Sequence, residues 1–138
     1  LSASMEFPIL KKKTNLGVIP DVKIPVGLRT KTGYQTVLFL LDTGADFTML
    51  PKHIAEWLGI DLTTLPQDRS YGIEGGKGVT VWASKIRVKI YRHELEIRCL
   101  FSDNDACPYI LGRADIFSHF NILFDNAKGK IRLTKINS

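Results

Sequence analysis

The stretch LLDTGADFTML, residues 40–50, places two acids four positions apart, directly after the most apolar run in the chain. Thr36 to Leu41 is apolar almost throughout, and it predicts a strand that is covered on both faces and ends at Asp42. Burying an isolated ionised carboxylate costs several kcal/mol unless the group is paired, hydrogen-bonded or protonated. Asp42 therefore needs a partner or a proton, and the rest of the sequence has to supply it.

Length and composition predict a single domain. The chain has 138 residues, of which 44% are hydrophobic, enough for one core but not for two. We therefore interpret residues 1–138 as one domain. Residues 1–4 precede a methionine and are interpreted as a remnant of an expression tag or a trimmed edge.

The charge and hydropathy patterns argue against nucleic-acid and membrane partners. The net charge is +5, but the only dense basic cluster is Lys11–Lys13, and most other basic residues alternate with apolar ones. That alternation is typical of the exposed face of a sheet rather than a nucleic-acid site. No apolar run approaches the ~20 residues of a membrane-spanning helix, and the N-terminus lacks the apolar core of a signal peptide. We expect a soluble protein with no nucleic-acid and no membrane partner.

The cysteines and histidines predict neither a disulfide framework nor a metal site. Cys99 alternates with apolar residues, which indicates a core thiol in a reducing compartment, and Cys107 is not placed to form a metal-ligand pair with it. His53, His93 and His119 do not cluster with acids or cysteines at ligand spacing. We expect no metal, no cofactor and a cytoplasmic location.

Hydrophobic periodicity predicts a mainly β chain with two short helices. Residues 22–28 alternate as in a half-buried strand, and Pro51 is placed to begin a helix that Gly59 ends. Residues 85–90 and 94–99 predict a hairpin that sets Ile90 opposite Leu95 and Lys89 opposite Glu96.

Three later segments complete the prediction. YGIEGGKGV, at residues 71–79, predicts a hairpin that turns at Gly75-Gly76. YILGR, at residues 109–113, predicts a short buried strand followed by a helical turn from Ala114 to Phe117. The stretch 121–133 predicts a closing hairpin that turns near Lys128-Gly129.

The order of LLDTGADFTML, GIEGG and YILGR resembles that of the retroviral-type aspartic proteases, the retropepsins. The similarity runs from about Val22 to Phe124. The helix after the first motif and the C-terminal hairpin are more similar to cellular or bacterial retroviral-like domains than to the shortest viral enzymes. The resemblance implies an all-β, closed barrel-like acid protease fold with a flap hairpin and one or two short helices.

Peptide hydrolysis by carboxylates alone asks for a second acid. One group must accept a proton from water while the other donates one to the substrate carbonyl. The chain has a single Asp-Thr-Gly and no room for a second lobe, and Asp103 and Asp105 lack both the apolar approach and the following glycine. The simplest partner is Asp42 of a second chain, related by two-fold symmetry. We therefore predict a homodimeric aspartic endopeptidase that cleaves extended polypeptides with an Asp42/Asp42' dyad.

The resemblance also implies roles for the neighbouring residues. Thr43 would hydrogen-bond across the dimer axis, and Gly44 would let backbone N–H groups approach the carboxylates. Asp46 would pair with Arg113 and, with Ala45, contact the substrate backbone. The Gly-rich hairpin would be the flap, contacting substrate through Ile73, Glu74, Gly75 and Gly76. Family dimers usually interleave their terminal strands, for which Met5 to Leu10 and Lys130 to Ile136 are the candidate segments.

Other readings of the same residues stay open. A second interpretation takes Asp42 only as a turn-forming residue, Asp46 and Arg113 only as a structural ion pair, and the glycines only as a surface hairpin. On that interpretation the chain is a catalytically silent retropepsin-like module for dimerisation or peptide binding. A third reading, nucleic-acid binding through the basic faces, predicts steeply salt-dependent affinity.

Overall fold

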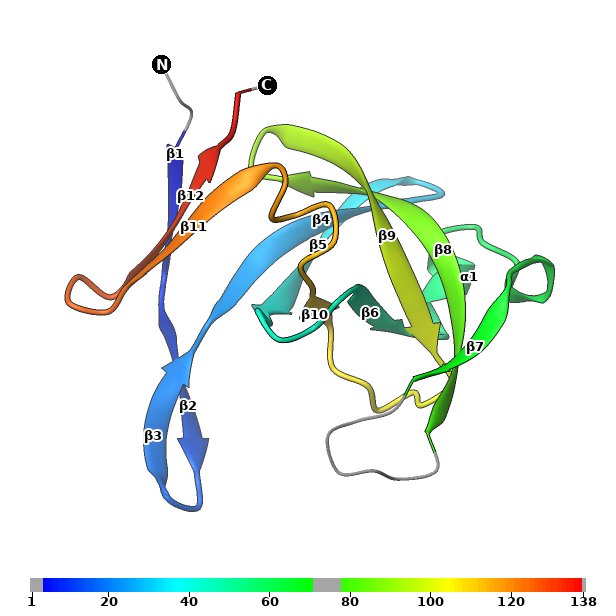
Figure 1. Cartoon of the computed structure of the whole chain (residues 1–138), viewed down its shortest axis with the longest axis horizontal. Helices are drawn as coiled ribbons and strands as arrows, with labels where there is room; N and C mark the ends of the chain where they lie inside the picture. The colour runs from blue at the N-terminus through cyan, green and yellow to red at the C-terminus, as the bar shows by residue number, and fades with distance from the viewer. Residues whose placement is uncertain (1–3, 71–77, 138) are drawn as a thin grey trace.

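The computed structural model describes residues 4–70 and 78–137, which form twelve strands and two short helices (Figure 1). The strands are β1 (Ser4–Pro8), β2 (Leu10–Thr14), β3 (Gly17–Asp21), β4 (Lys23–Thr30), β5 (Gly33–Leu41), β6 (Thr48–Pro51), β7 (Gln67–Ser70), β8 (Val79–Ile90), β9 (His93–Ser102), β10 (Ile110–Leu111), β11 (Phe120–Asp125) and β12 (Lys130–Lys135). The helices are α1 (Ile54–Trp57) and a 3₁₀-helix at Leu62–Thr64. This confirms the all-β prediction.

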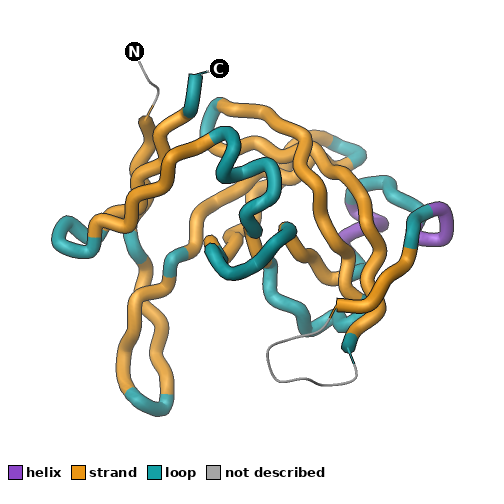
Figure 2. Tube along the Cα trace, viewed as in Figure 1, coloured by secondary structure: helices purple, strands orange, loops and turns teal. Residues whose placement is uncertain are grey.

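Six strands close into a barrel that makes up the body of the molecule (Figures 1 and 2). The large sheet runs β4-β5-β10-β6-β9-β8-β7, and a further pairing of β4 with β8 closes the ring. β5 with β10 and β6 with β9 run parallel, whereas the other neighbours are antiparallel. The closure leaves β7 as the edge of this sheet.

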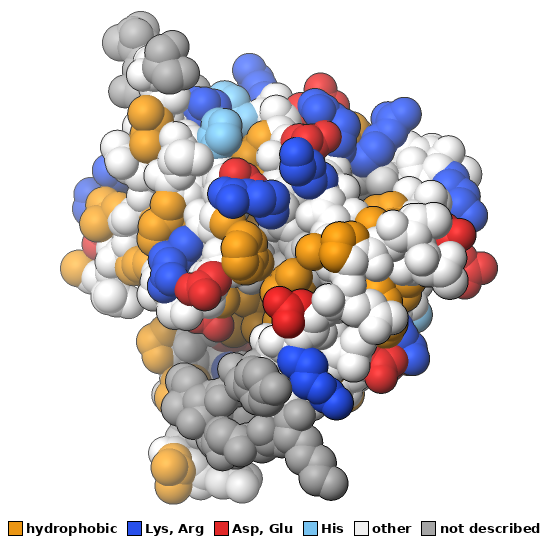
Figure 3. All heavy atoms as spheres, turned by 45° about the vertical axis from the view of Figure 1, so that its right-hand side comes forward, with side chains coloured by type: hydrophobic (Ala, Val, Ile, Leu, Met, Phe, Trp, Pro, Cys, Tyr) orange, Lys and Arg blue, Asp and Glu red, His pale blue; other side chains and the backbone are white. Residues whose placement is uncertain are grey.

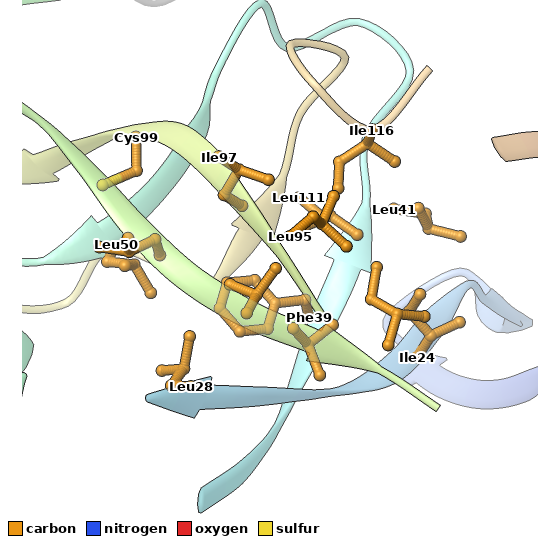
Figure 4. Packing of buried hydrophobic residues seen from close by; sticks show 14 of the residues in the cluster. Ile24, Leu28, Phe39, Leu41, Leu50, Leu95, Ile97, Cys99, Leu111 and Ile116 are labelled. Carbon is orange, nitrogen blue, oxygen red and sulfur yellow. The ribbon is translucent and has the colours of Figure 1, made fainter. Parts of the chain in front are cut away.

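The barrel interior is the hydrophobic core. Figure 4 shows side chains from β4, β5, β6, β9 and β10 packing together, with Ile116 from the turn after β10 beside them. Phe39, Ile97 and Leu50 have no exposed surface. Fully burying one such side chain contributes about 1.5–3 kcal/mol, so the period-two alternation of these strands fixes which face turns inward.

The prediction that β5 is covered on both faces is wrong. Phe39 and Leu41 point into the core, but Leu38 is 49% exposed. A strand of a closed barrel has a single interior face, and the apolar run continued onto the outer one. Apolarity on both faces therefore does not mean burial on both faces here.

The predicted register of the β8–β9 hairpin is wrong by two residues. Ile90 lies opposite His93 rather than Leu95, and Lys89 lies opposite Glu94 rather than Glu96. The turn takes only two residues, and Tyr91 adopts a positive φ of 56°. A shift of two residues keeps every apolar side chain on the core face, so the hydrophobic pattern could not distinguish the two registers.

The helices differ in detail from the prediction. Pro51 is the last residue of β6 and not the start of the helix, which begins at Ile54. Gly59 follows the helix with a φ of +72°, as expected for a helix-ending glycine. After β10, a single helical turn closes with the Phe117 N–H bonded to the Arg113 carbonyl. Within the described ranges, no helix is long and apolar enough to cross a membrane.

The chain termini share a separate sheet. Its order is β1-β12-β11, and Met5 lies opposite Leu133 of the same chain. The predicted closing hairpin is confirmed, with Gly129 at a φ of +64° in the turn between β11 and β12. The segments expected to interleave between two chains are therefore already paired within one chain.

Candidate active site

The Asp-Thr-Gly triplet begins the loop between β5 and β6. The Asp42 N–H donates to the Leu111 carbonyl at 3.1 Å, which fixes the loop to β10. The Gly44 N–H donates to Asp42 Oδ1 at 3.0 Å, and the Ala45 N–H donates to the Asp42 carbonyl at 3.2 Å. The carboxylate is thus oriented by its own tight turn.

Asp42 is not buried in the single chain. Leu41 is 4% exposed, but Asp42 is half-buried and both Thr43 and Gly44 are exposed. The expectation of a carboxylate driven into the interior is therefore corrected. The strand ends in the core, and the acid stands just outside it at the surface.

The YILGR segment holds this loop from the other side. β10 pairs in parallel with β5, setting Ile110 opposite Leu40. Beyond β10, the Arg113 N–H donates to the Ala45 carbonyl and the Ala114 N–H to the Asp46 carbonyl, both at 2.9 Å. Two segments about 70 residues apart in the sequence therefore fix each other's backbone.

Gly112 is required by the closeness of that approach. Its N–H donates to the Thr48 hydroxyl at 3.2 Å in a buried hydrogen bond. A Cβ at this position would lie 2.5 Å from the Phe47 carbonyl oxygen, closer than any real contact. Only glycine fits at this position of YILGR without a steric clash.

Arg113 bridges both ends of the active-site loop. One guanidinium nitrogen lies 2.5 Å from Asp46 Oδ1, and another donates to the Thr43 carbonyl at 3.0 Å. Both side chains are well exposed, with 43% of the Arg113 and 74% of the Asp46 side-chain surface accessible. In the single chain, the Asp46–Arg113 ion pair therefore lies at the surface.

A second ion pair beside this loop was missed by the sequence analysis. Asp115 accepts from the Arg98 backbone N–H at 2.7 Å and from two guanidinium nitrogens at 3.1 and 3.2 Å. These bonds from Arg98 lower the pKa of Asp115, and Asp115 raises the pKa of Arg98. The Arg98 guanidinium also lies 5.7 Å from the centre of the Phe47 ring. The pair joins β9 to the turn after β10.

A groove of about 900 Å³ runs from the active-site loop to the β7–β8 hairpin. Its lining combines apolar and charged residues of the loop, β7, β8 and β9: Asp46, Phe47, Leu65, Asp68, Arg69, Ser70, Val81, Ala83, Ser84, Lys85, Arg98, Cys99 and Leu100. β7 and β8 pair antiparallel as far as Ser70 opposite Val79, so they form the arms of the predicted flap hairpin. The expected flap contacts Ile73, Glu74, Gly75 and Gly76 lie outside the described residues.

A second hollow, of about 270 Å³, lies on the other side of the triplet. It is lined by Thr43 together with Phe117 and residues of β11. Phe117 is 41% exposed and Ile122 on β11 is half-buried, so Thr43 borders a partly uncovered apolar surface. We call Thr43, Phe117 and Ile122 the triplet face. In the described ranges no group of three or more His, Cys, Asp or Glu is arranged to hold a metal ion.

Comparison with known proteins agrees with this geometry. The sequence model of the family described as "Aspartyl protease" matches residues 26–113, from β4 to the end of YILGR. No curated protein sequence matches the chain.

Solved structures also resemble the chain. A retropepsin-like aspartic protease from Rickettsia conorii is 22% identical, with a TM-score of 0.64 over 98% of this chain and 96% of that chain. EIAV protease in complex with the inhibitor HBY-793 is 23% identical, covering 67% of this chain and 82% of that chain with a TM-score of 0.48. The barrel, the family match and the fold likeness lead to one conclusion: the chain belongs to the aspartyl protease family and has the retropepsin-like fold.

Proposed function

We propose that the chain is a single-domain aspartic endopeptidase that acts as a homodimer, with Asp42 of each chain in one shared site. The single observation that carries the proposal is the position of Asp42, half-buried and held by the Gly44 N–H, in a surface loop of an aspartyl protease fold. A lone carboxylate cannot both accept and donate a proton in the same step. A second copy of the loop supplies the missing group.

The triplet face is where we place the two-fold axis. It carries Thr43, the exposed side chain of Phe117 and the half-buried side chain of Ile122 beside the triplet. β11 is also an end strand of the β1-β12-β11 sheet, so one of its edges is unpaired within the described chain. An isologous contact here would bring both Asp42 loops together, cover apolar surface and satisfy a strand edge. Thr43 would then hydrogen-bond across the axis.

The chemistry follows from two carboxylates that share one proton. The ionised Asp42 accepts a proton from a water molecule, which attacks the peptide carbonyl carbon, while the protonated Asp42' donates to the carbonyl oxygen. Collapse of the tetrahedral species returns a proton to the leaving amine and releases both products without a covalent enzyme intermediate. Gly44 has no side chain, so its N–H can hold the carboxylate while substrate approaches.

The groove supports an extended peptide as the substrate. It runs beside the Asp46 carboxylate, whose side chain is 74% exposed and can accept a substrate backbone N–H while Arg113 holds its other side. We assign Ala45 and Asp46 to substrate binding, and the predicted flap residues to contacts from above. An extended backbone satisfies such main-chain partners at regular spacing.

The test is cleavage of a mixed peptide library across pH by the wild type and by Asp42→Asn. The proposal predicts cuts that disappear in Asp42→Asn and in the presence of a transition-state-mimicking aspartic protease inhibitor. Removing the proton shuttle should lower the rate at least ~10³-fold while the shape of the side chain is kept. No cleavage by the wild type at any pH would instead favour the catalytically silent dimerisation or peptide-binding module.

A further inference from the structure

β2 and β3 form a two-stranded ribbon that projects from the body of the molecule (Figures 1 and 2). It pairs from Leu10 opposite Asp21 to Thr14 opposite Gly17 and forms a sheet of its own. We call residues 10–21 the arm. The arm lies outside residues 26–113, which match the family, and the proposed catalytic chemistry does not use it. An isolated two-stranded ribbon is at best marginally stable in water, so its projection calls for an explanation.

The tip of the arm presents aliphatic side chains to solvent. Leu16 is 99% exposed, Val18 is 61% exposed and Ile19 is 46% exposed. Figure 3 shows hydrophobic atoms at the lower end of the molecule, where the arm ends in Figure 1. Exposed single apolar residues are ordinary, but three within four positions on a projecting ribbon form a concentrated apolar tip.

The turn holds Leu16 outward and satisfies its backbone. The Thr14 hydroxyl donates to the Gly17 carbonyl at 2.7 Å and accepts from the Leu16 N–H at 3.1 Å. Gly17 adopts a φ of +120°, which favours glycine. The tip can therefore leave water without exposing an unpaired Leu16 N–H to an apolar phase.

Three lysines stand behind this tip on both faces of the ribbon. Lys13 lies opposite Val18, Lys12 opposite Ile19 and Lys11 opposite Pro20. Successive residues of a strand face opposite sides, so each face carries basic and apolar side chains together. None of the three lysines forms an ion pair with a described residue, and Asp21 at the base pairs instead with Lys23 at 3.4 Å.

The charge and composition of the arm distinguish between its possible binding partners. A second copy of this chain carries a net charge of +5, which opposes docking of three unpaired lysines. Single-stranded nucleic acid is bound by stacking on aromatic side chains, and residues 10–21 contain no aromatic residue and no arginine. An anionic lipid surface matches both features, because headgroups attract lysines and the acyl boundary accepts aliphatic side chains.

We propose that the arm docks the protein reversibly on an anionic bilayer surface, with Leu16 entering the headgroup region first and Lys11, Lys12 and Lys13 at the level of the lipid phosphates. The proposal does not depend on the proposed peptidase activity. The sequence pattern predicted no membrane partner because it did not show that the lysines and the aliphatic residues project together. Two modest signals of this kind give peripheral and reversible binding rather than permanent anchoring.

The test is sedimentation with lipid vesicles. Vesicles of phosphatidylcholine with about one-third phosphatidylglycerol should bind the wild type, and vesicles of pure phosphatidylcholine should not. Each lysine near an anionic surface is worth about 1 kcal/mol, or about fivefold in partitioning, so Lys11→Gln/Lys12→Gln/Lys13→Gln should lower binding about a hundredfold. Leu16→Ser should lower binding about tenfold.

A matched variant controls for net charge. Lys31→Gln/Lys89→Gln/Arg92→Gln removes the same number of charges from the β4–β5 turn, the end of β8 and the β8–β9 turn, away from the arm in Figure 1, and should bind vesicles within about threefold of the wild type. An unchanged melting temperature of the arm variants would show that they fold.

Three results would overturn the proposal. The first is equal binding to neutral and anionic vesicles, or binding to neither. The second is equal loss of binding in the control variant. The third is an arm variant that keeps vesicle binding but changes the oligomeric state or the affinity for an oligonucleotide, because the occupant would then be a second copy or a nucleic acid.

Discussion

The Arg113 guanidinium lies 2.5 Å from the Asp46 carboxylate oxygen and thereby joins the segment after β10 to the loop that carries Asp42. The same guanidinium donates to the Thr43 carbonyl, inside the triplet itself. Arg113 therefore positions the proposed catalytic loop without reaching the proposed reacting groups. Because the Arg113 side chain is exposed to solvent, removing it should lower the free energy of unfolding only moderately.

Replacing Arg113 by alanine should destabilise the monomer only moderately. The exposed ion pair contributes up to about 1 kcal/mol, and the hydrogen bond to the Thr43 carbonyl adds about 1 kcal/mol. We expect a total loss of about 1–2 kcal/mol in the free energy of unfolding, measured by urea denaturation at low protein concentration. Arg113→Lys keeps the charge but loses the planar guanidinium that bonds two partners at once. Its free energy of unfolding should therefore lie between those of the wild type and Arg113→Ala. An Arg113→Ala protein as stable as the wild type would contradict this account.

Replacing Gly112 by alanine should be more damaging. The new Cβ would collide with the Phe47 carbonyl, so the two segments must separate or strain, at a cost of about 2–3 kcal/mol in the free energy of unfolding. Gly44→Ala is the control, because its Cβ would make only an ordinary contact, 3.4 Å from Asp42 Oδ1. Thermal or urea unfolding should rank Gly112→Ala well below Gly44→Ala. Equal losses of unfolding free energy in the two variants would contradict a steric requirement for glycine at position 112.

The Arg98–Asp115 pair should make stability depend on pH in the acid range. Hydrogen bonds from Arg98 lower the pKa of Asp115 below its unfolded value of about 3.9, so the folded state gains stability that is present above that pH. This contribution is lost as pH falls through the lowered pKa. The difference in unfolding free energy between the wild type and Asp115→Asn should therefore be constant near neutrality and shrink below about pH 4. A difference that stays constant down to pH 2 would refute the assignment.

Cys99 should be inert in the folded protein. Burial raises the pKa of its thiol to about 12, and its side chain is 1% exposed, so little reactive thiolate forms at pH 8. In a Cys107→Ser variant, a thiol reagent should modify Cys99 slowly in buffer and rapidly in denaturing urea. Rapid modification without denaturant would contradict this prediction, because it would show that the Cys99 thiol is accessible from the groove in the folded protein.

Local patterns predicted most of the barrel but not the β8–β9 turn. The alternation in β4, β8 and β9 identified their core faces because one slip would expose every apolar side chain. The β8–β9 register was not predicted because Tyr91 adopts a positive φ in the turn. A glycine at this position would have indicated such a conformation. Leu38 was misplaced because apolar composition does not reveal which strand face a barrel leaves outside.

The candidate site was predictable only in part. Asp42, Asp46 and Arg113 follow from quoted motifs and a family resemblance, and the structure brings Asp46 and Arg113 into contact. The Arg98–Asp115 pair joins a strand to a turn 17 residues later, and neither residue stands in a pattern that points to the other. The shared dyad stays a prediction, because it depends on a second chain.

Mixing of wild-type and Asp42→Asn chains tests that dyad most directly. If each active site takes one Asp42 from each chain, only wild-type homodimers cleave, and an equimolar mixture after subunit exchange should retain about a quarter of the wild-type activity at equal total protein. Activity should fall as the square of the wild-type fraction across a titration of the two chains. A linear decline, with about half the activity left in the equimolar mixture, would mean that each chain works alone and would contradict the shared Asp42 pair.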